Sequence, residues 1–247
     1  MPKPPPLPTV VLLPGLASDA TVWHEQLPAL ASRSCVHVSD VHFRHDSIDA
    51  MATALLAELP GPLVLVGTSM GGMVALAAQR QAPARVQGLA LLGTTARPDT
   101  PELVRLRTDA IGYFEQGRVD EVLQANLLFA FHPNSLRRRA LVDGYLGFVR
   151  RAGAAQLIRQ NRAVMARIDS RPLLPAVCCP ALVLCGEADR LTPPEHAQEL
   201  AAGIPGARLE MVPGAGHMLT MEQPARVNAL LLAWLETLGR PAPGVSP

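Results

Sequence analysis

Short apolar segments alternate along the chain with longer segments in which apolar residues recur every three or four positions. Most of the short segments are rich in Val and Leu at successive positions, which is typical of strands buried on both faces of a sheet. The pattern predicts six strands, at residues 9–13, 35–41, 63–66, 86–92, 180–185 and 209–212. The longer segments are typical of amphipathic helices. They predict helices at residues 22–31, 47–59 (with Ser47 as N-cap), 70–81, 194–202 and 224–238.

Strands that alternate with helices in this way predict an α/β fold, with a mostly parallel sheet of about six strands and helices on both faces. Residues 97–171 interrupt the alternation, because they contain no strand pattern. Several short helices are expected there, with breaks at Gly117, Pro133, Gly144, Gly147 and Gly153.

The same segment contains six of the nine aromatic residues of the chain. It follows the end of a strand, and ligand sites of α/β sheets lie at the carboxyl ends of the strands. We therefore expect a helical lid at 97–171 over a pocket, inserted into a core domain at 9–96 and 172–240. The alternative is a plain helical subdomain whose aromatic side chains fill its own small core.

Composition limits the domain size, the binding partners and the cellular compartment that can be expected. A chain of 247 residues suffices for one large α/β domain, and its net charge of +1 gives no general attraction to nucleic acid or membranes. No uncharged apolar run approaches the roughly 18 residues of a membrane span, and the first residues, MPKPPPLP, lack the apolar region of a secretory signal. The cysteines match neither a metal site nor a disulfide framework, and buried free thiols are expected at Cys35, Cys178, Cys179 and Cys185. These features favour the cytoplasm.

Charge is uneven within the expected lid. Residues 137–171 contain nine Arg and two Asp, a local net charge of +7. One reading is a solvated helical surface in a protein whose basic residues are almost all arginines. The other is a docking face for an acidic partner or for an anionic part of a substrate.

The segment Gly67-Thr68-Ser69-Met70-Gly71 has the pattern G-x-S-x-G between a predicted strand and a predicted helix. At such a sharp turn strand and helix approach closely, which would explain glycines two positions before and after the serine. The turn would lift the Ser69 hydroxyl clear of the sheet, and the first amides of the helix would favour developing negative charge there. A glycine-rich turn with an incidental serine is the alternative.

A serine hydroxyl is a weak nucleophile until a base removes its proton. Among the seven histidines, His217 alone follows the last predicted strand, in the small-residue loop PGAGHM. A third group must orient the imidazole. Asp189 follows the preceding strand and is preferred over the nearby Glu187, because it lies deeper in its loop; the alternative role for Asp189 is a capping or turn aspartate.

The chain order Ser69, Asp189, His217, with each residue after a different strand, resembles the α/β-hydrolase superfamily. The resemblance extends from VVLLPG to the last helix. It implies the α/β-hydrolase fold and an acyl-enzyme mechanism, with Ser69 as nucleophile and His217 as general base and then acid. Only a short Pro-rich stretch precedes Thr9, so the leading antiparallel hairpin of the family is not expected.

The resemblance also implies an oxyanion hole. The turn at Ser69 would supply the backbone N–H of Met70, and the loop after the first strand, LLPGLASD, would supply the second donor. Many relatives have His-Gly where this chain has Pro14-Gly15, but a backbone donor does not require the histidine. Leu16 is the candidate for the second amide, with Ala17 as the weaker alternative.

A serine in the nucleophile position argues against the epoxide hydrolases and dehalogenases of the superfamily, which use a carboxylate. GTSMGGMVA is similar to the enol-lactonase and small-ester branches, so we expect a serine esterase for small to medium acyl esters. Alternatives are an esterase for esters on an acidic carrier protein bound at the Arg-rich lid, an enol-lactonase, a carbon–carbon bond hydrolase, or a non-catalytic ligand receptor. The mechanism needs no cofactor, and the histidines lack the spacing of metal ligands.

Overall fold

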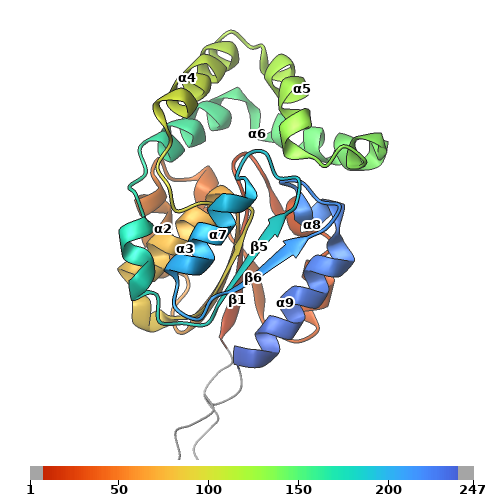
Figure 1. Cartoon of the computed structure of the whole chain (residues 1–247). Coiled ribbons are helices and arrows are strands. Elements are labelled where there is room, and N and C mark those ends of the chain that lie inside the picture. The colour runs from red at the N-terminus through yellow and green to blue at the C-terminus, as the bar shows by residue number, and fades with distance from the viewer. Residues whose placement is uncertain (1–7, 239–247) are drawn as a thin grey trace, which may run out of the picture.

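The computed structural model describes residues 8–238, which contain a sheet of six parallel strands with the order β2-β1-β3-β4-β5-β6 (Figure 1). Every pair of neighbouring strands is parallel. The predicted α/β fold and its six strands are therefore confirmed. The strands are β1 (Thr9–Leu13), β2 (Val36–Val38), β3 (Leu63–Thr68), β4 (Val86–Leu92), β5 (Ala181–Gly186) and β6 (Arg208–Val212).

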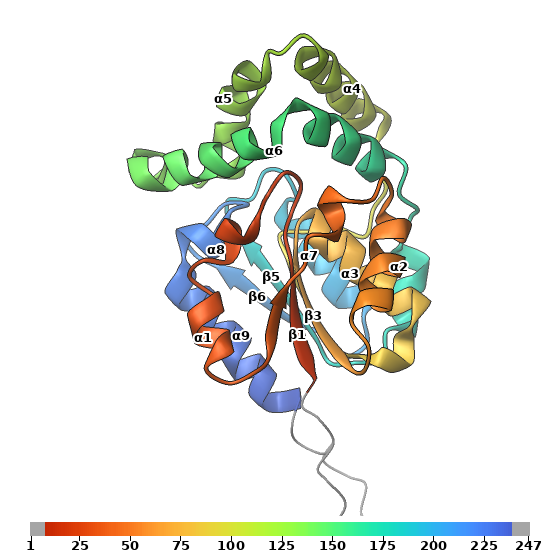
Figure 2. The ribbon, with the colours of Figure 1, turned by 180° about the vertical axis from the view of Figure 1, so that it is seen from behind.

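Helices cover both faces of the sheet, as Figures 1 and 2 show. One face carries α2 (Ile48–Glu58), α3 (Met70–Gln81) and α7 (Pro194–Gly203), and the other carries α1 (Leu27–Ala31), α8 (Leu219–Glu222) and α9 (Pro224–Leu238). Short 3₁₀ segments lie at Ala20–Trp23, Val41–Phe43, Pro83–Arg85, Ser135–Arg137 and Arg171–Ala176.

Successive strand residues face opposite sides of the sheet and so divide the apolar core into two layers. In β3, Leu63 and Leu65 pack with the α2, α3 and α7 side, whereas Val64 and Val66 pack with the α1 and α9 side. Strand β3 lies in the centre of the sheet, between β1 and β4, where all six of its residues are buried, and the chain continues from it into Ser69.

Helix α3 has the predicted bounds, and the Ser47 hydroxyl accepts a hydrogen bond from the Ala50 N–H at 3.1 Å, as expected of an N-cap. The prediction of one continuous helix at 22–31 is wrong, because the structure divides this segment into two short elements. Its first part is a 3₁₀ turn, and α1 begins only at Leu27, with Pro28 in its first turn, where the missing N–H of proline costs nothing.

The strand predicted at 35–41 is shorter than expected. Strand β2 lies at the edge of the sheet and pairs only with β1, and its last register pair joins Val38 to Leu12. The Ser39 N–H still donates to the Leu12 carbonyl at 3.0 Å, after which the chain turns into the 3₁₀ segment Val41–Phe43. The one-sided pairing of an edge strand does not hold the remaining residues extended.

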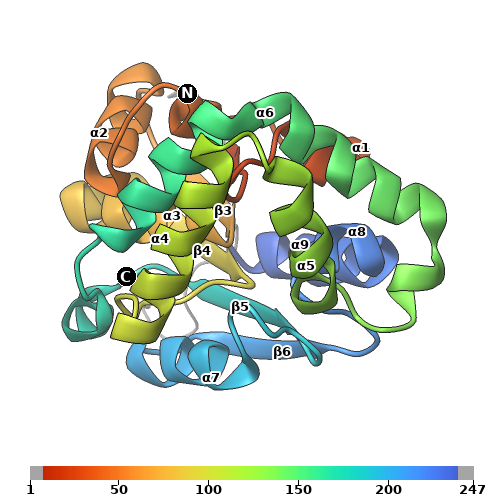
Figure 3. The same ribbon diagram turned by 90° about the horizontal axis from the view of Figure 1, so that it is seen from above.

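Three helices lie between β4 and β5 in the chain: α4 (Pro101–Glu115), α5 (Val119–Ala130) and α6 (Arg139–Met165). They form a layer over the carboxyl ends of the strands, and the view from above shows them spread across that edge (Figures 1 and 3). We call residues 97–171 the helical insertion. The division of the core at these residues stays a prediction; positions 239 and 240 and the Pro-rich N-terminal residues 1–7 lie outside the described residues.

Two of the expected helix breaks in the insertion are confirmed as positions with positive φ: Gly117 (φ 75°) separates α4 from α5, and Gly153 (φ 74°) interrupts α6. Pro133 lies in the connection between α5 and α6. The breaks expected at Gly144 and Gly147 are wrong, since both lie within helical turns of α6. A helical glycine costs only about 1 kcal/mol, which the burial of neighbouring apolar side chains offsets.

The aromatic side chains of the insertion divide into two groups. Phe114, Phe131, Tyr145 and Phe148 are buried, and the rings of Phe131 and Phe148 both make edge-to-face contacts with Tyr145, with centroids 5.3 Å apart. The other two are exposed: Tyr113 and Phe129. Most of these rings therefore join the core layer that continues under α1 and α9.

Replacing Gly71 with alanine should destabilise the fold, because a Cβ there would lie 2.0 Å from the Leu13 carbonyl oxygen. We expect a loss of roughly 2–3 kcal/mol or more in the free energy of unfolding, measured by urea denaturation. Gly112→Ala is the matched control. It lies within α4 with no atom near its new Cβ, and should be neutral or stabilise by about 0.5–1 kcal/mol. Equal stabilities of the two variants would contradict this account.

Candidate active site

Ser69 lies on the turn between β3 and α3 in a backbone conformation that residues other than glycine rarely adopt, with φ 49° and ψ −119°. Two hydrogen bonds hold it there. The Ser69 N–H donates to the Leu92 carbonyl at 2.9 Å, and the Thr94 hydroxyl donates to the Ser69 carbonyl at 2.6 Å. Both partners belong to the end of β4 and the turn after it, so the neighbouring strand fixes the strained residue.

The glycines around Ser69 mark places where backbones touch. A Cβ at Gly67 would lie 2.4 Å from the Gly71 carbonyl oxygen, and a Cβ at Gly72 would lie 2.6 Å from the Thr94 side chain. No side chain fits at these positions without movement of the strand or the helix. The structure therefore gives a steric reason for the G-x-S-x-G pattern.

Asp189 and His217 lie on loops after β5 and β6 and contact each other, with 2.9 Å between Asp189 Oδ2 and His217 Nδ1. Both side chains are almost fully buried. The Asp189 carboxylate also accepts bonds from the N–H groups of Leu191 and Thr192 and from the Thr192 hydroxyl, each at 2.9 Å. Glu187, the competing acid, is exposed and accepts instead from the Gly214 N–H at 2.8 Å.

The pair perturbs the acidity of both partners. Burial opposes ionisation of Asp189, but the charge of His217 and the hydrogen bonds from His217 and Thr192 outweigh it and lower the pKa of the carboxyl. Burial likewise opposes protonation of His217, but the charge of Asp189 and its hydrogen bond outweigh it and raise the pKa of the imidazole. An ionised Asp189 can only accept, so Nδ1 carries the proton and Nε2 of the neutral ring is an acceptor, as a general base requires.

The turn after β4 brings this pair to the edge of the sheet where Ser69 lies. Gly93 has φ 51°, and a Cβ there would lie 3.3 Å from Asp189 Oδ2 and 3.4 Å from His217 Nδ1. The preceding residue, Leu92, accepts the hydrogen bond of Ser69. The Asp189–His217 pair and the backbone of Ser69 thus both border the turn after β4, although the three residues are 120 and 28 positions apart in the chain.

The two amides predicted for the oxyanion hole belong to Met70, which follows Ser69 in the chain, and to Leu16 in the loop after β1. Within residues 8–238, neither the Met70 N–H nor the Leu16 N–H donates to an acceptor of the protein. The loop that holds Leu16 touches the turn, because a Cβ at Gly15 would lie 3.2 Å from Ser69 Cβ. The Ala17 N–H, by contrast, donates to Gln160 Oε1 at 2.6 Å. Leu16 and Met70 therefore remain the candidates for the amides of an oxyanion hole, whereas the alternative, the Ala17 N–H, is already engaged.

The sequence profile of the Alpha/beta hydrolase family matches residues 10–230. The chain belongs to this family. A pimeloyl-[acyl-carrier protein] methyl ester esterase of Chromobacterium violaceum is 28% identical, over 85% of this chain and 87% of that protein. Polyketide synthase ThaQ of Burkholderia thailandensis is 31% identical over 95% of this chain, which spans only 12% of the synthase. A thermophilic esterase from Thermogutta terrifontis has a similar solved structure, with 28% identity, a TM-score of 0.86, and coverage of 96% of this chain and 92% of that one.

In this member of the alpha/beta hydrolase family, Glu222 is a site residue that the sequence did not reveal. It is 2% exposed, and its two carboxylate oxygens accept bonds at 2.8 Å from the N–H groups of Gly216 and His132. It thereby joins the His217 loop to the end of α5, and its charge also favours protonation of His217. Glu222 lies on α8, a helix of four residues that is too short for a periodic pattern.

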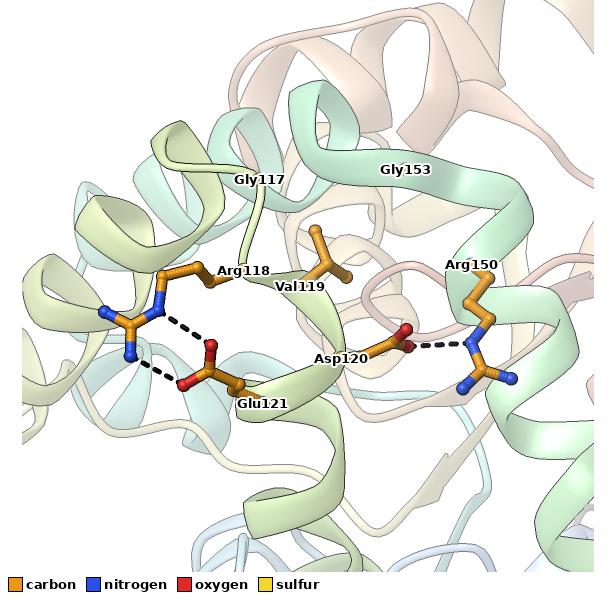
Figure 4. A pocket seen from close by; sticks show the side chains of 7 residues that line it. All are labelled: Gly117, Arg118, Val119, Asp120, Glu121, Arg150 and Gly153. Atoms are coloured by element: carbon orange, nitrogen blue, oxygen red, sulfur yellow. Dashed lines mark hydrogen bonds and ion pairs between the residues drawn. The ribbon is translucent and has the colours of Figure 1, made fainter.

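A second feature of the insertion is an open cleft of about 360 Å³ where α5 and α6 diverge (Figure 4). Ion pairs border it: Arg118 with Glu121 at 2.6 Å, and Arg150 with Asp120 at 2.8 Å. None of the residues that line the cleft belongs to the site around Ser69. Two glycines with positive φ, at positions 117 and 153, also line it, so the cleft lies at the bends of the insertion.

The cysteines are all free, but the expectation that they are buried is wrong for Cys35 and Cys178, which are exposed. Among the described residues, no three or more His, Cys, Asp or Glu side chains are grouped so that they could hold a metal ion. No helix within residues 8–238 combines the length and the apolar character needed to span a membrane.

The pKa of His217 should lie above the ordinary imidazole value of 6.5, and Asp189→Asn should bring it below that value, because burial then outweighs the smaller effect of the Glu222 charge that remains. NMR titration of the histidine side chains, assigned with His217→Gln, measures both. Glu187→Gln is the matched control and should leave the titration of His217 unchanged, since Glu187 bonds to Gly214. A His217 titration that Asp189→Asn does not move would contradict the assigned pair.

Proposed function

We propose that this protein is a serine hydrolase that cleaves carboxylic esters of small to medium acyl groups through an acyl-enzyme intermediate. The observation that carries the proposal is the buried Asp189–His217 pair at the sheet edge where Ser69 occupies its strained turn. Membership of the alpha/beta hydrolase family and the similarity to an esterase at 28% identity support it.

In this mechanism Nε2 of His217 removes the proton of the Ser69 hydroxyl as the oxygen attacks the ester carbonyl carbon. The oxygen of the tetrahedral intermediate receives hydrogen bonds from the N–H groups of Met70 and Leu16. His217 then donates the proton to the leaving alcohol. Water repeats the sequence on the acyl-enzyme and releases the acid, while Asp189 keeps the proton on Nδ1 throughout.

The helical insertion is proposed as a lid on a core formed by 9–96 and 172–240. Its contacts with the His217 loop support this role: the Met218 N–H donates to the Ala130 carbonyl at 3.1 Å, and a Cβ at Gly216 would lie 2.6 Å from the His132 nitrogen. A lid in this position would limit the entry of water and select the acyl group. A cytoplasmic location is proposed as well, because all four cysteines are free and two are exposed.

A second candidate is an esterase that acts on an acyl group attached to an acidic carrier protein, as the name of the relative from Chromobacterium violaceum suggests for that protein. The charges of the insertion favour this candidate less than the small-ester function. Six of the nine arginines between 137 and 171 form ion pairs with acids of the same chain: Arg150, Arg151, Arg159, Arg162, Arg167 and Arg171. The local positive charge is thereby largely offset, which leaves less of it for a partner.

Ser69→Ala should remove turnover of p-nitrophenyl acetate by a factor of about 10⁴ or more, because no nucleophile remains. A small fluorophosphonate should label the wild-type protein at Ser69, as located by mass spectrometry, and should not label the variant. The melting temperature should change little, and Ser32→Ala, which replaces an exposed serine, should behave like wild type. Turnover retained in Ser69→Ala would refute the mechanism. Tight ligand binding by a protein without turnover or labelling would indicate a receptor.

Ionic strength separates the two candidate substrates. Hydrolysis of p-nitrophenyl esters should change less than about twofold between 20 and 500 mM salt, because a neutral ester is not steered by charge. Hydrolysis of a methyl ester carried by an acyl carrier protein should fall steeply over the same range if the carrier is the partner. A carrier-linked ester turned over much faster than the free ester, with this salt dependence, would favour the second candidate.

A further inference from the structure

Gln160 is a fully buried polar residue on α6 that has no part in the mechanism above. Its side-chain amide makes two hydrogen bonds to the backbone of the core. Oε1 accepts from the Ala17 N–H at 2.6 Å, and Nε2 donates to the His42 carbonyl at 2.9 Å. Because a backbone N–H only donates and a carbonyl only accepts, these partners fix the orientation of the amide.

A third hydrogen bond closes a ring. His42 is buried, and its Nε2 donates to the Ser18 carbonyl at 2.7 Å. The ring therefore joins three segments that are distant in sequence: the loop after β1, the 3₁₀ segment Val41–Phe43, and α6. Loss of one member would leave buried polar groups without partners, which makes such a ring an all-or-none unit.

The part of the ring contributed by the loop is a strained turn. The Ser18 N–H donates to the Gly15 carbonyl at 3.1 Å, so residues 15–18 form a β-turn. Ala17 is the third residue of this turn and has φ 55°, a value that a type II turn requires and that glycine normally supplies. Apart from Ser69, no other described residue that is not glycine has a positive φ. Alanine keeps such a conformation only where its surroundings stabilise it, and the bond to Gln160 is made to its own N–H.

The turn lies against the nucleophile. A Cβ at Gly15 would lie 3.2 Å from Ser69 Cβ and 3.5 Å from the Thr68 carbonyl oxygen. The second residue of the turn is Leu16, whose N–H is the proposed oxyanion donor. Displacement of a catalytic group by about 1 Å can cost a factor of about 100 in rate, so the conformation of this turn matters for turnover.

We infer that Gln160 is a positioning residue for the oxyanion hole, because it holds the Ala17 N–H and thereby fixes the turn that presents the Leu16 N–H beside Ser69. The inference rests on the proposed function, since an oxyanion forms only in acyl transfer. Helix α6 would then not only cover the site but also fix the conformation of the turn at residues 15–18. Stabilisation of the transition state then requires α6 to be docked on the core.

Gln160→Met tests this, because methionine has nearly the same size and shape but cannot form the two bonds. We expect kcat for p-nitrophenyl acetate to fall about 10- to 100-fold with KM within about twofold, since an oxyanion donor acts in the transition state. A trifluoromethyl ketone, which forms a tetrahedral adduct with the serine, should bind more weakly by the same factor as the loss in kcat/KM.

Gln156→Met is the matched control. Gln156 lies one turn earlier on α6, and its Nε2 donates to the Phe43 carbonyl at 2.9 Å, so it also fastens the helix to the core. It does not touch the turn, and its link to Gln160 is a long bond, in which Gln160 Nε2 donates to Gln156 Oε1 at 3.4 Å. Its kcat should stay within about threefold of wild type, although both variants lower the melting temperature. Equal losses of kcat in the two variants, or a loss that appears only in KM, would overturn the inference and leave Gln160 as an anchor of the helix.

A rescue experiment isolates the turn itself. Glycine adopts positive φ without strain, so Ala17→Gly in the Gln160→Met background should recover part of the lost kcat. No recovery would contradict the claim that Gln160 acts through the conformation of Ala17.

Amide hydrogen exchange at residues 15–18 supplies a readout that needs no turnover. Exchange should be at least about tenfold faster in Gln160→Met than in wild type or Gln156→Met. Unchanged exchange would overturn this inference alone. A wild-type protein that shows neither ester turnover nor labelling of Ser69 would instead remove the proposed function, which keeps the two failures distinct.

Discussion

The close approach of α3 to the ends of β1 and β3 is the constraint on which the site depends. At Gly71 the helix backbone touches the Leu13 carbonyl, and at Gly67 the strand touches the helix, so neither position has space for a side chain. Contact at this distance forces the chain to turn within one residue, and that residue, Ser69, takes a positive φ. The strain is retained because bonds from the end of β4 hold both the N–H and the carbonyl of Ser69.

Buried polar groups connect the remaining parts of the site to this turn. Both carboxylate oxygens of Asp189 accept two hydrogen bonds each, from His217, from the N–H and hydroxyl of Thr192, and from the Leu191 N–H. These bonds hold the carboxylate in one orientation before any substrate binds. Glu222 and Gln160 act over longer distances and join the insertion to the His217 loop and to the loop after β1. A buried polar group without a partner is costly, so these bonds restrict the insertion to one arrangement over the strand ends.

Much of the fold could be predicted from the sequence because its elements carry strong local signals. Helix α3 and strand β4 have the bounds that the apolar pattern predicts, since a buried strand or an amphipathic helix displays its environment in its own residues. Predictions from the local sequence were wrong where tertiary contacts override the helix propensity of a residue. Gly144 reads as a break, yet it lies within α6, because the helix gains more from the burial of Tyr145 and Phe148 than it loses at a glycine.

The sequence by itself determined the succession of strands and helices along the chain, because each has its own apolar pattern. It also determined the residues of the candidate site, because Ser69, Asp189 and His217 each follow a recognisable strand. The sequence favoured Asp189 over Glu187, and only the tertiary structure decided between them: Asp189 lies buried against His217, whereas Glu187 bonds to the Gly214 N–H. It also revealed Gln160 and Glu222, whose partners are 143 and 90 positions away. A hydrogen bond between distant segments leaves no local periodicity, since it depends on how the sheet and the insertion pack together.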